Sequence, residues 1–331
     1  MQKEAKFYKK EPVGKTRCLL CPHRCFLANN KAGVCKIRVN KDGILYDIAY
    51  GEISTYAMDP IEKKPLYHFY PGSEIFSIGT WGCNFKCTFC QNWSISQQQV
   101  PTEIFTSEEI VDIAIKQKSL GIAYTYNEPF IWYEFVYDTA KMAKQKGLKN
   151  VLVTNGFVNE DPLREILPLI DALNIDLKAN NESFYREICG GQLPPVMRTI
   201  KLSFNAGKHV EITNLLIPTL NDKDEEIESI VDWLAGISKD IPLHFSRYYP
   251  QYLMNIEPTD IATLNKAYNI AKQKLNYVYT GNVPLEQGQI NTVCPNCKKE
   301  LIKRDLNGIK ISGLEGNACQ SCKTSIYGQF E

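Results

Sequence analysis

The chain has 331 residues and a formal net charge of +1, because 38 Lys and Arg are nearly balanced by 37 Asp and Glu. This balance argues against a protein that binds nucleic acid mainly through a basic surface. The charged N-terminus is unlike a signal peptide, and no apolar stretch is long enough to span a bilayer, so we expect a cytoplasmic protein without a membrane partner. Twelve cysteines outnumber four histidines, and in a reducing compartment clustered cysteines favour metal sites over disulfides.

Residues 1–70 are predicted to form an N-terminal Cys-rich segment. Its clustered cysteines are Cys18, Cys21, Cys25 and Cys35. They predict a metal site that holds zinc or a second iron–sulfur cluster, in which His23 could replace one thiolate, and four free thiols are the alternative. A second cluster would offer an electron route to a catalytic one, whereas zinc would be structural. A hairpin is predicted over Lys36–Val39 and Ile44–Ile48, because Asp42-Gly43 supplies the positive φ that the turn needs.

Residues 71–285 alternate apolar β-branched runs with amphipathic segments. The predicted strands are Glu74–Gly79, Ile122–Tyr126, Asn150–Thr154, Ala172–Leu177, His209–Pro218 and Leu243–Tyr248, with a seventh short run at Tyr277–Thr280. The predicted helices include Thr106–Lys118, Ile131–Lys146 and Asp224–Ile237. This alternation predicts an α/β fold with parallel strands, either a partial or full β/α barrel or a doubly wound sheet. In a barrel, functional residues gather at the carboxyl ends of the strands.

Three cysteines follow the first of these strands. Cys83, Cys87 and Cys90 have the spacing Cys-x3-Cys-x2-Cys, with Phe89 before the last of them. Iron–sulfur cubanes are normally held by four thiolates, so three ligands would leave one iron open for chemistry. The alternatives are structural thiols or a zinc site completed by a distant histidine. A compact loop directly after a strand favours the [4Fe–4S] cluster.

Residues 286–331 have paired cysteines at both ends. Cys294, Cys297, Cys319 and Cys322 have the spacing of a four-cysteine zinc ribbon. A structural zinc would stabilise a segment too small for a core of its own. The basic residues of this segment, Lys298, Lys299, Lys303 and Arg304, would suit a docking surface, but they are interpreted as ordinary solvated charge.

The central loop resembles the signature of the radical S-adenosylmethionine (SAM) superfamily, including the aromatic residue at Phe89. The resemblance implies a partial TIM-type (β/α)6 barrel in which the open iron of a [4Fe–4S] cluster binds SAM. Reductive cleavage would then give methionine and a 5′-deoxyadenosyl radical, with the electron coming from a donor such as ferredoxin or flavodoxin. The cofactor performs the hard step, and the protein positions it.

Later strand ends supply candidate SAM contacts. Asn127 and Glu128 stand where the superfamily has a Gly-Gly-Glu-Pro-like segment, and Glu128 could accept hydrogen bonds from the methionine ammonium. A lone Glu-Pro is otherwise a common helix start. Thr154 and Asn155 stand at the end of the third strand, and resemblance to glycyl-radical-enzyme activases, such as the pyruvate formate-lyase activating enzyme, implies that they belong to the same site.

The same resemblance places Asp176 and Lys178 beside SAM, where Lys178 could pair with its carboxylate or act in catalysis. The alternative is that this pair forms a solvated loop contact, which would contribute little to stability. Asn214 is a candidate ribose or carboxylate contact. His244 is a candidate catalytic residue, although a lone histidine is as often structural. Cys189 could be a hydrogen donor or radical relay, but an ordinary thiol is the better interpretation.

The combination of motifs is more specific than the superfamily. The first cysteine cluster, Asp59–Phe69, Cys90–Gln97, Tyr126–Pro129 and the terminal ribbon together resemble the radical enzyme of the AmmeMemoRadiSam system. That resemblance implies Memo-type and AMMECR-type partners and hydrogen abstraction from a substrate that the sequence does not identify.

Two alternative functions follow from the same motifs. The first is a glycyl-radical-enzyme activase. It is disfavoured because Val153 replaces an acidic residue of the activases and Thr213-Asn214 stands where they have an arginine. The second is a catalytically inactive metal-binding interaction module, which the intact cysteine loop and Glu128 disfavour.

Overall fold

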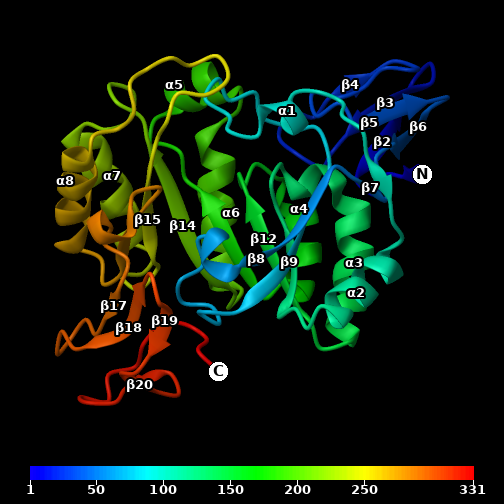
Figure 1. Ribbon diagram of the computed structural model, residues 1–331. Helices are drawn as coiled ribbons and strands as arrows, with labels where there is room; N and C mark the ends of the chain where they lie inside the picture. The colour runs from blue at the N-terminus through cyan, green and yellow to red at the C-terminus, as the bar shows by residue number, and fades with distance from the viewer.

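The computed structural model describes residues 1–331 and is built around one eight-stranded sheet (Figure 1). The strand order is β16-β15-β14-β13-β12-β11-β9-β8. Seven strands are parallel: β9 (Glu74–Gly79), β11 (Gly121–Tyr124), β12 (Lys149–Thr154), β13 (Ala172–Asp176), β14 (His209–Leu216), β15 (Leu243–Arg247) and β16 (Val278–Gly281). The edge strand β8 (Thr55–Pro60), which the sequence analysis placed in the N-terminal segment, pairs antiparallel with β9.

Helices connect the parallel strands, which confirms the predicted α/β fold. The longer ones are α2 (Ser107–Lys116), α3 (Tyr133–Gln145), α4 (Glu160–Ile166), α6 (Leu193–Asn205), α7 (Asp224–Ala235) and α8 (Ile261–Lys272). Six β/α units and a seventh parallel strand are consistent with the partial TIM-type (β/α)6 barrel. Helix α2 begins where predicted, because Thr106 and Glu109 form a capping box. No helix has the length and apolar character that a membrane crossing requires.

The N-terminal segment consists of short antiparallel sheets. One sheet has the order β1-β6-β5 and another the order β2-β3-β4. Their strands are β1 (Lys3–Glu4), β2 (Tyr8–Glu11), β3 (Lys15–Cys18), β4 (Phe26–Leu27), β5 (Arg38–Lys41) and β6 (Ile44–Asp47), and β7 (Glu52–Ile53) pairs with β10 (Glu103–Ile104). The predicted hairpin is confirmed, since Asp42 (φ 53°) and Gly43 (φ 81°) form a two-residue turn between β5 and β6.

The C-terminal segment lies at the end of the sheet opposite the short helices α1 (Trp93–Ser96) and α5 (Glu182–Phe184) (Figure 1). It contains β17 (Thr292–Val293), β18 (Glu300–Asp305), β19 (Gly308–Ile311), β20 (Leu314–Glu315) and β21 (Ala318–Cys319). The prediction that Arg304 carries solvated charge is wrong, because the residue is 6% exposed. Its guanidinium donates to the carbonyls of Tyr67 (2.7 Å) and Ile290 (2.9 Å) and thereby joins this segment to the barrel.

A buried polar network fills the amino-terminal end of the barrel. The Glu211 carboxylate accepts hydrogen bonds from His209 Nε2 (2.9 Å), His244 Nε2 (2.6 Å) and the backbone N–H groups of Tyr67 (3.0 Å) and His68 (2.7 Å). Burial would raise the pKa of Glu211, but the hydrogen bonds from His209 and His244 outweigh it and lower the pKa. This end of a β/α barrel serves stability. His244 therefore lies in a structural network, and the catalytic role predicted for it does not fit this position.

We predict that Glu211→Gln lowers the free energy of unfolding by about 3 kcal/mol, because both imidazoles lose a charged buried acceptor. Chemical denaturation of the purified protein measures this change. Glu228→Gln, on the exposed face of α7, is the matched control and should change the free energy by less than about 0.5 kcal/mol. Equal stability of the two variants would contradict the structural role of the network.

Candidate functional site

The cysteine loop follows β9 at the carboxyl end of the parallel strands, and other segments hold its backbone. The Lys86 N–H donates to the Cys189 carbonyl (2.7 Å), and the Thr88 N–H donates to the Ile188 carbonyl (3.1 Å). Both acceptors belong to a turn of π-helix that ends at Cys189. The loop therefore receives its shape from a segment about a hundred residues later in the chain.

The N-terminal segment holds the other side of the loop. Gly82 has a φ of +86°, and a Cβ atom there would lie 2.4 Å from the Cys35 carbonyl oxygen. His23 Nε2 lies 2.7 Å from the Asn84 carbonyl oxygen, so the imidazole contacts the residue next to Cys83. This contact gives His23 a role in bracing the loop, whereas the sequence analysis considered it as a metal ligand.

Two of the loop cysteines have opposite electrostatic surroundings. Burial, followed by the charge of Glu128, raises the pKa of the Cys83 thiol well above its ordinary value. A thiol contact from Cys189, followed by the charge of Lys178, outweighs burial and lowers the pKa of the Cys87 thiol. The two thiols are thus influenced by charges of opposite sign.

Glu128 follows β11 and is buried, with an exposed fraction of 1%. Its carboxylate accepts hydrogen bonds from the N–H groups of Phe130 (3.0 Å) and Asn155 (2.8 Å) and from Thr154 Oγ1 (2.8 Å). Burial outweighs these hydrogen bonds and raises the pKa of Glu128 to about 7. Asn155 Nδ2 lies 3.8 Å from Cys83 Sγ, so three predicted site residues meet beside the cysteine loop.

The lysine side of the site comes from the end of β13. Lys178 Nζ lies 2.9 Å from Asp176 Oδ2 and 5.6 Å from the centre of the Phe89 ring. The lysine side chain is only 12% exposed, unlike a solvated loop pair. Burial would lower the pKa of Lys178, but the negative charges of Asp176 and Cys87 outweigh it and raise the pKa. Lys178 is thus held as a cation beside the cysteine loop.

Asn127 and Asn214, which the sequence predicted as SAM contacts, form hydrogen bonds with backbone groups of the site. Asn127 Nδ2 donates to the Gly82 carbonyl (2.9 Å) and its Oδ1 accepts from the Thr80 N–H (3.3 Å), which ties the loop after β11 to the cysteine loop. Asn214 Nδ2 donates to the Leu177 carbonyl (2.7 Å). Its Oδ1 is buried without a partner, so Asn214 keeps one acceptor free near the mouth of the barrel.

Further residues of the site carried no readable signal in the sequence. Ser96 Oγ lies 3.2 Å from Cys90 Sγ, and the Tyr185 hydroxyl accepts a hydrogen bond from the Lys178 N–H (3.0 Å). Both act through the three-dimensional arrangement, since neither belongs to a spaced motif. Cys189, which the sequence left as an ordinary thiol, is fully buried against the loop.

The spacing of the sulfur atoms separates two kinds of cysteine site. Only the ribbon cysteines Cys294, Cys297, Cys319 and Cys322 bring three or more ligand atoms all within 4.8 Å of one another. The sulfurs of Cys83, Cys87 and Cys90 do not belong to this compact group. The thiolates of a cubane bind different irons, so a [4Fe–4S] cluster does not need its ligands to meet at one ion.

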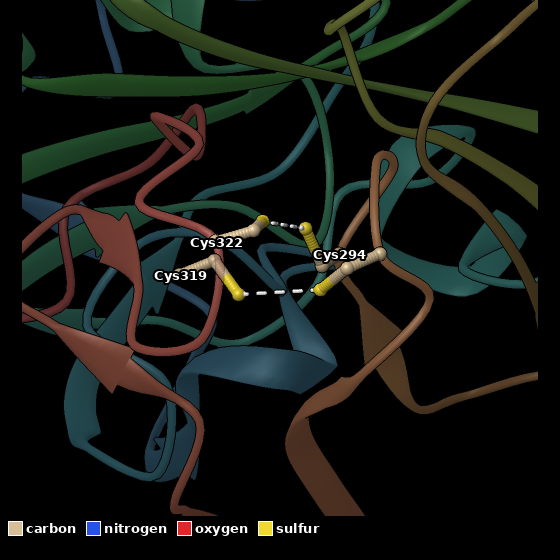
Figure 2. Close-up of side chains that lie close together, drawn as sticks. Cys294, Cys319 and Cys322 are labelled. Atoms are coloured by element: carbon tan, nitrogen blue, oxygen red, sulfur yellow. Dashed lines mark hydrogen bonds between the residues drawn. The ribbon is translucent and has the colours of Figure 1, made fainter.

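The ribbon cysteines form a compact four-sulfur group (Figure 2). Cys294 Sγ lies 3.5 Å from Cys322 Sγ, and Cys297 Sγ lies 3.6 Å from Cys319 Sγ. Four sulfurs at 2.3 Å from a tetrahedral zinc would be about 3.8 Å apart. A hydrogen bond from Thr324 lowers the pKa of Cys322 to about 5, which favours the thiolate that a metal needs. The donor set fits one zinc ion.

Known proteins resemble the chain in sequence and in fold. The model of the Radical SAM superfamily matches residues 77–234. An uncharacterized protein of Methanocaldococcus jannaschii is 44% identical, over 98% of each chain. A putative glycyl-radical enzyme activating enzyme of the same organism is 28% identical over 62% of this chain and 80% of its own. The crystal structure of a radical SAM methyltransferase from Sphaerobacter thermophilus shares the fold, with a TM-score of 0.52 and 13% identity over 87% of this chain and 81% of that one.

These matches, together with the cysteine loop at the end of β9, define an enzyme of the radical SAM type. Residues 77–234 form a radical SAM domain, and the chain is homologous to the activating enzymes of glycyl-radical enzymes. The superfamily implies a [4Fe–4S] cluster and SAM as its cofactors.

We predict that Cys322→Ser removes a metal ion from the ribbon, because three thiolates no longer complete its tetrahedron. Elemental analysis of the purified protein should find about one zinc per chain fewer than in the wild type. Ser321→Ala changes the exposed neighbour and is the matched control. Unchanged zinc in Cys322→Ser would contradict the site.

Proposed function

We propose that the chain cleaves SAM reductively at a [4Fe–4S] cluster held by Cys83, Cys87 and Cys90, and that the resulting 5′-deoxyadenosyl radical abstracts hydrogen from a substrate. One observation carries the proposal. Asn155 donates to the Glu128 carboxylate and lies 3.8 Å from Cys83 Sγ, and Lys178 Nζ lies 5.6 Å from the centre of the Phe89 ring, so a carboxylate and an ammonium flank the cysteine loop. The methionine part of SAM presents the complementary ammonium and carboxylate. Charge-assisted hydrogen bonds to both would orient the cosubstrate.

Glu128 is preorganised for this role. The hydrogen bonds from Thr154 and from the N–H groups of Phe130 and Asn155 fix its carboxylate before any ligand arrives. A fixed acceptor loses little conformational entropy on binding. Because burial raises the pKa of Glu128 to about 7, the ammonium of SAM would supply a countercharge to this buried carboxylate.

Lys178 and the aromatic residues complete the site. Asp176 orients the ammonium of Lys178 (2.9 Å), and the buried ring of Phe89 faces it. Phe85, between the loop and the turn at Gly191, is 1% exposed. This apolar wall excludes water from the thiols and would protect a carbon radical from side reactions.

The direct test is anaerobic. We expect the reconstituted protein, with dithionite and SAM, to form 5′-deoxyadenosine, and Cys87→Ala to form none because it lacks one cluster ligand. Chromatography quantifies the product, and circular dichroism verifies that the variant is folded. Product formation by Cys87→Ala at the wild-type rate would refute the proposal.

A second test addresses Glu128. Glu128→Gln should weaken SAM binding roughly 10- to 100-fold, because a charged hydrogen-bond partner is lost. In the wild type, affinity should fall as the pH drops below about 7, since protonation removes the carboxylate. Calorimetry on cluster-loaded protein between pH 6 and 8 measures both effects. Glu160→Gln, at the exposed start of α4, is the control, and a pH-independent wild type would contradict the role.

A second candidate function is activation of a glycyl-radical enzyme. The homology to a putative activating enzyme over 80% of its length favours it, while Val153 and Thr213 depart from the activase pattern. The Memo-type and AMMECR-type partners and a ferredoxin- or flavodoxin-type donor remain predictions from the resemblance. Copurification with each tagged partner tests them, and a radical on a candidate glycyl enzyme would select the activase.

A further inference from the structure

The N-terminal cysteines form a group of buried thiols that the proposed function does not use. Cys18, Cys21 and Cys35 are at most 9% exposed, and Cys25 is half-buried. They come from β3, the turn that follows it and the loop before β5. A Cβ atom on Gly33 would lie 3.4 Å from Cys25 Sγ, so the loop that carries Cys35 packs against Cys25.

Backbone contacts fix this group. The Cys18 N–H donates to the Cys25 carbonyl (3.0 Å), which closes the first three cysteines into one hairpin. The Val34 N–H points at Cys25 Sγ (3.5 Å), a contact that stabilises a metal-bound thiolate. Arg38, which follows Cys35 in this segment, is 1% exposed and forms a buried ion pair with Glu134 (2.5 Å).

The spacing of these sulfurs differs from that of the ribbon. The four ribbon sulfurs lie within 4.8 Å of one another and form a group sized for a single ion. Neither the N-terminal sulfurs nor those of Cys83, Cys87 and Cys90 belong to this compact group. The thiolates of a cubane bind different irons and do not need to meet at one ion.

The group directly adjoins the central loop. The Cys35 carbonyl packs on Gly82, and His23, between Cys21 and Cys25, contacts the Asn84 carbonyl at 2.7 Å. Gly82 and Asn84 flank Cys83 in the sequence. A redox centre on the four thiols would therefore be one residue layer away from the central cysteines, a short path for electron transfer.

The N-terminal segment has an excess of basic residues. Residues 1–50 carry eleven Lys and Arg against four Asp and Glu, although the whole chain is only +1. Lys9, Lys10, Arg24 and Lys31 are exposed on this segment. A basic face attracts an acidic protein and speeds its association at low ionic strength.

We propose that Cys18, Cys21, Cys25 and Cys35 hold a second [4Fe–4S] cluster, which receives electrons from an acidic donor protein docked on the basic N-terminal face and passes them to the central site. The inference rests on the proposed function only for its electron acceptor. One electron from a reduced flavin or iron–sulfur protein converts the N-terminal cluster from the 2+ to the 1+ state. The same electron then moves to the central cluster, the N-terminal one returns to 2+, and no bond or proton changes.

Iron counting tests the site without any activity. We compare the wild type, a central triple variant (Cys83→Ala, Cys87→Ala, Cys90→Ala) and an N-terminal double variant (Cys21→Ala, Cys35→Ala), each reconstituted anaerobically. The wild type should hold about eight irons, four per cubane, and each variant about four. After reduction with dithionite, SAM should alter the electron paramagnetic resonance signal of the N-terminal variant and leave that of the central variant unchanged.

The outcomes separate the alternatives. A central triple variant without iron would overturn the second cluster, and an extra zinc lost by the N-terminal variant would show a zinc site in its place. A central variant with as much iron as the wild type would instead show that the proposed function fails at the central loop. If the double variant does not fold, the iron contents of the wild type and the central variant still show whether a second cluster is present.

A rate measurement tests the relay. With a flavodoxin-type donor, the SAM-sensitive signal should appear more slowly in the N-terminal variant than in the wild type, whereas dithionite should reduce both alike. The wild-type rate should fall with added salt, because salt screens the basic face. Equal rates with the protein donor would overturn the relay.

Discussion

The arrangement of the site depends on one constraint: the cysteine loop has no regular hydrogen bonding of its own and is shaped by its neighbours. The Cys189 and Ile188 carbonyls accept from its N–H groups on one side, and the Leu253 N–H donates to its Thr88 carbonyl on another. The N-terminal segment closes the third side at Gly82. Because buried backbone groups need partners, these contacts hold three thiols in fixed positions before a cluster forms. Segments far apart in the sequence thus determine one metal site.

The two ends of the barrel divide chemistry from stability. At the carboxyl ends, Glu128 and Lys178 flank the thiols, and their charges shift the thiol pKa values in opposite directions. At the amino ends, Glu211 satisfies two histidines and Arg304 joins the C-terminal segment to the barrel. Charged groups are buried at both ends, but only those at the carboxyl end lie beside sulfur atoms. This separation lets the ribbon stabilise the fold without entering the reaction site.

The sequence predicted the elements well and the side-chain contacts poorly. The strand starting at Glu74 has the predicted bounds, because an apolar run between turn residues signals a buried strand. The cysteine spacings also predicted the candidate metal ligands. The sequence left the role of His244 open between catalysis and structure, because inward polar residues look alike in sequence at both ends of a barrel strand. Arg304 was misjudged because its charge is visible in the sequence and its carbonyl partners are not. Asn127 bonds the backbone of a different loop, which no local pattern reveals.

The central claim is that the cysteine loop leaves one iron of its cluster open for SAM, although Cys189 is buried beside Cys87. Mössbauer spectroscopy on protein reconstituted with iron-57, using the N-terminal double variant so that one cluster is observed, tests this directly. Addition of SAM should change the parameters of one iron of the cluster and leave the others as they were. A cluster whose irons are all unaffected by SAM would show that the fourth position is filled, and it would contradict this account of the site.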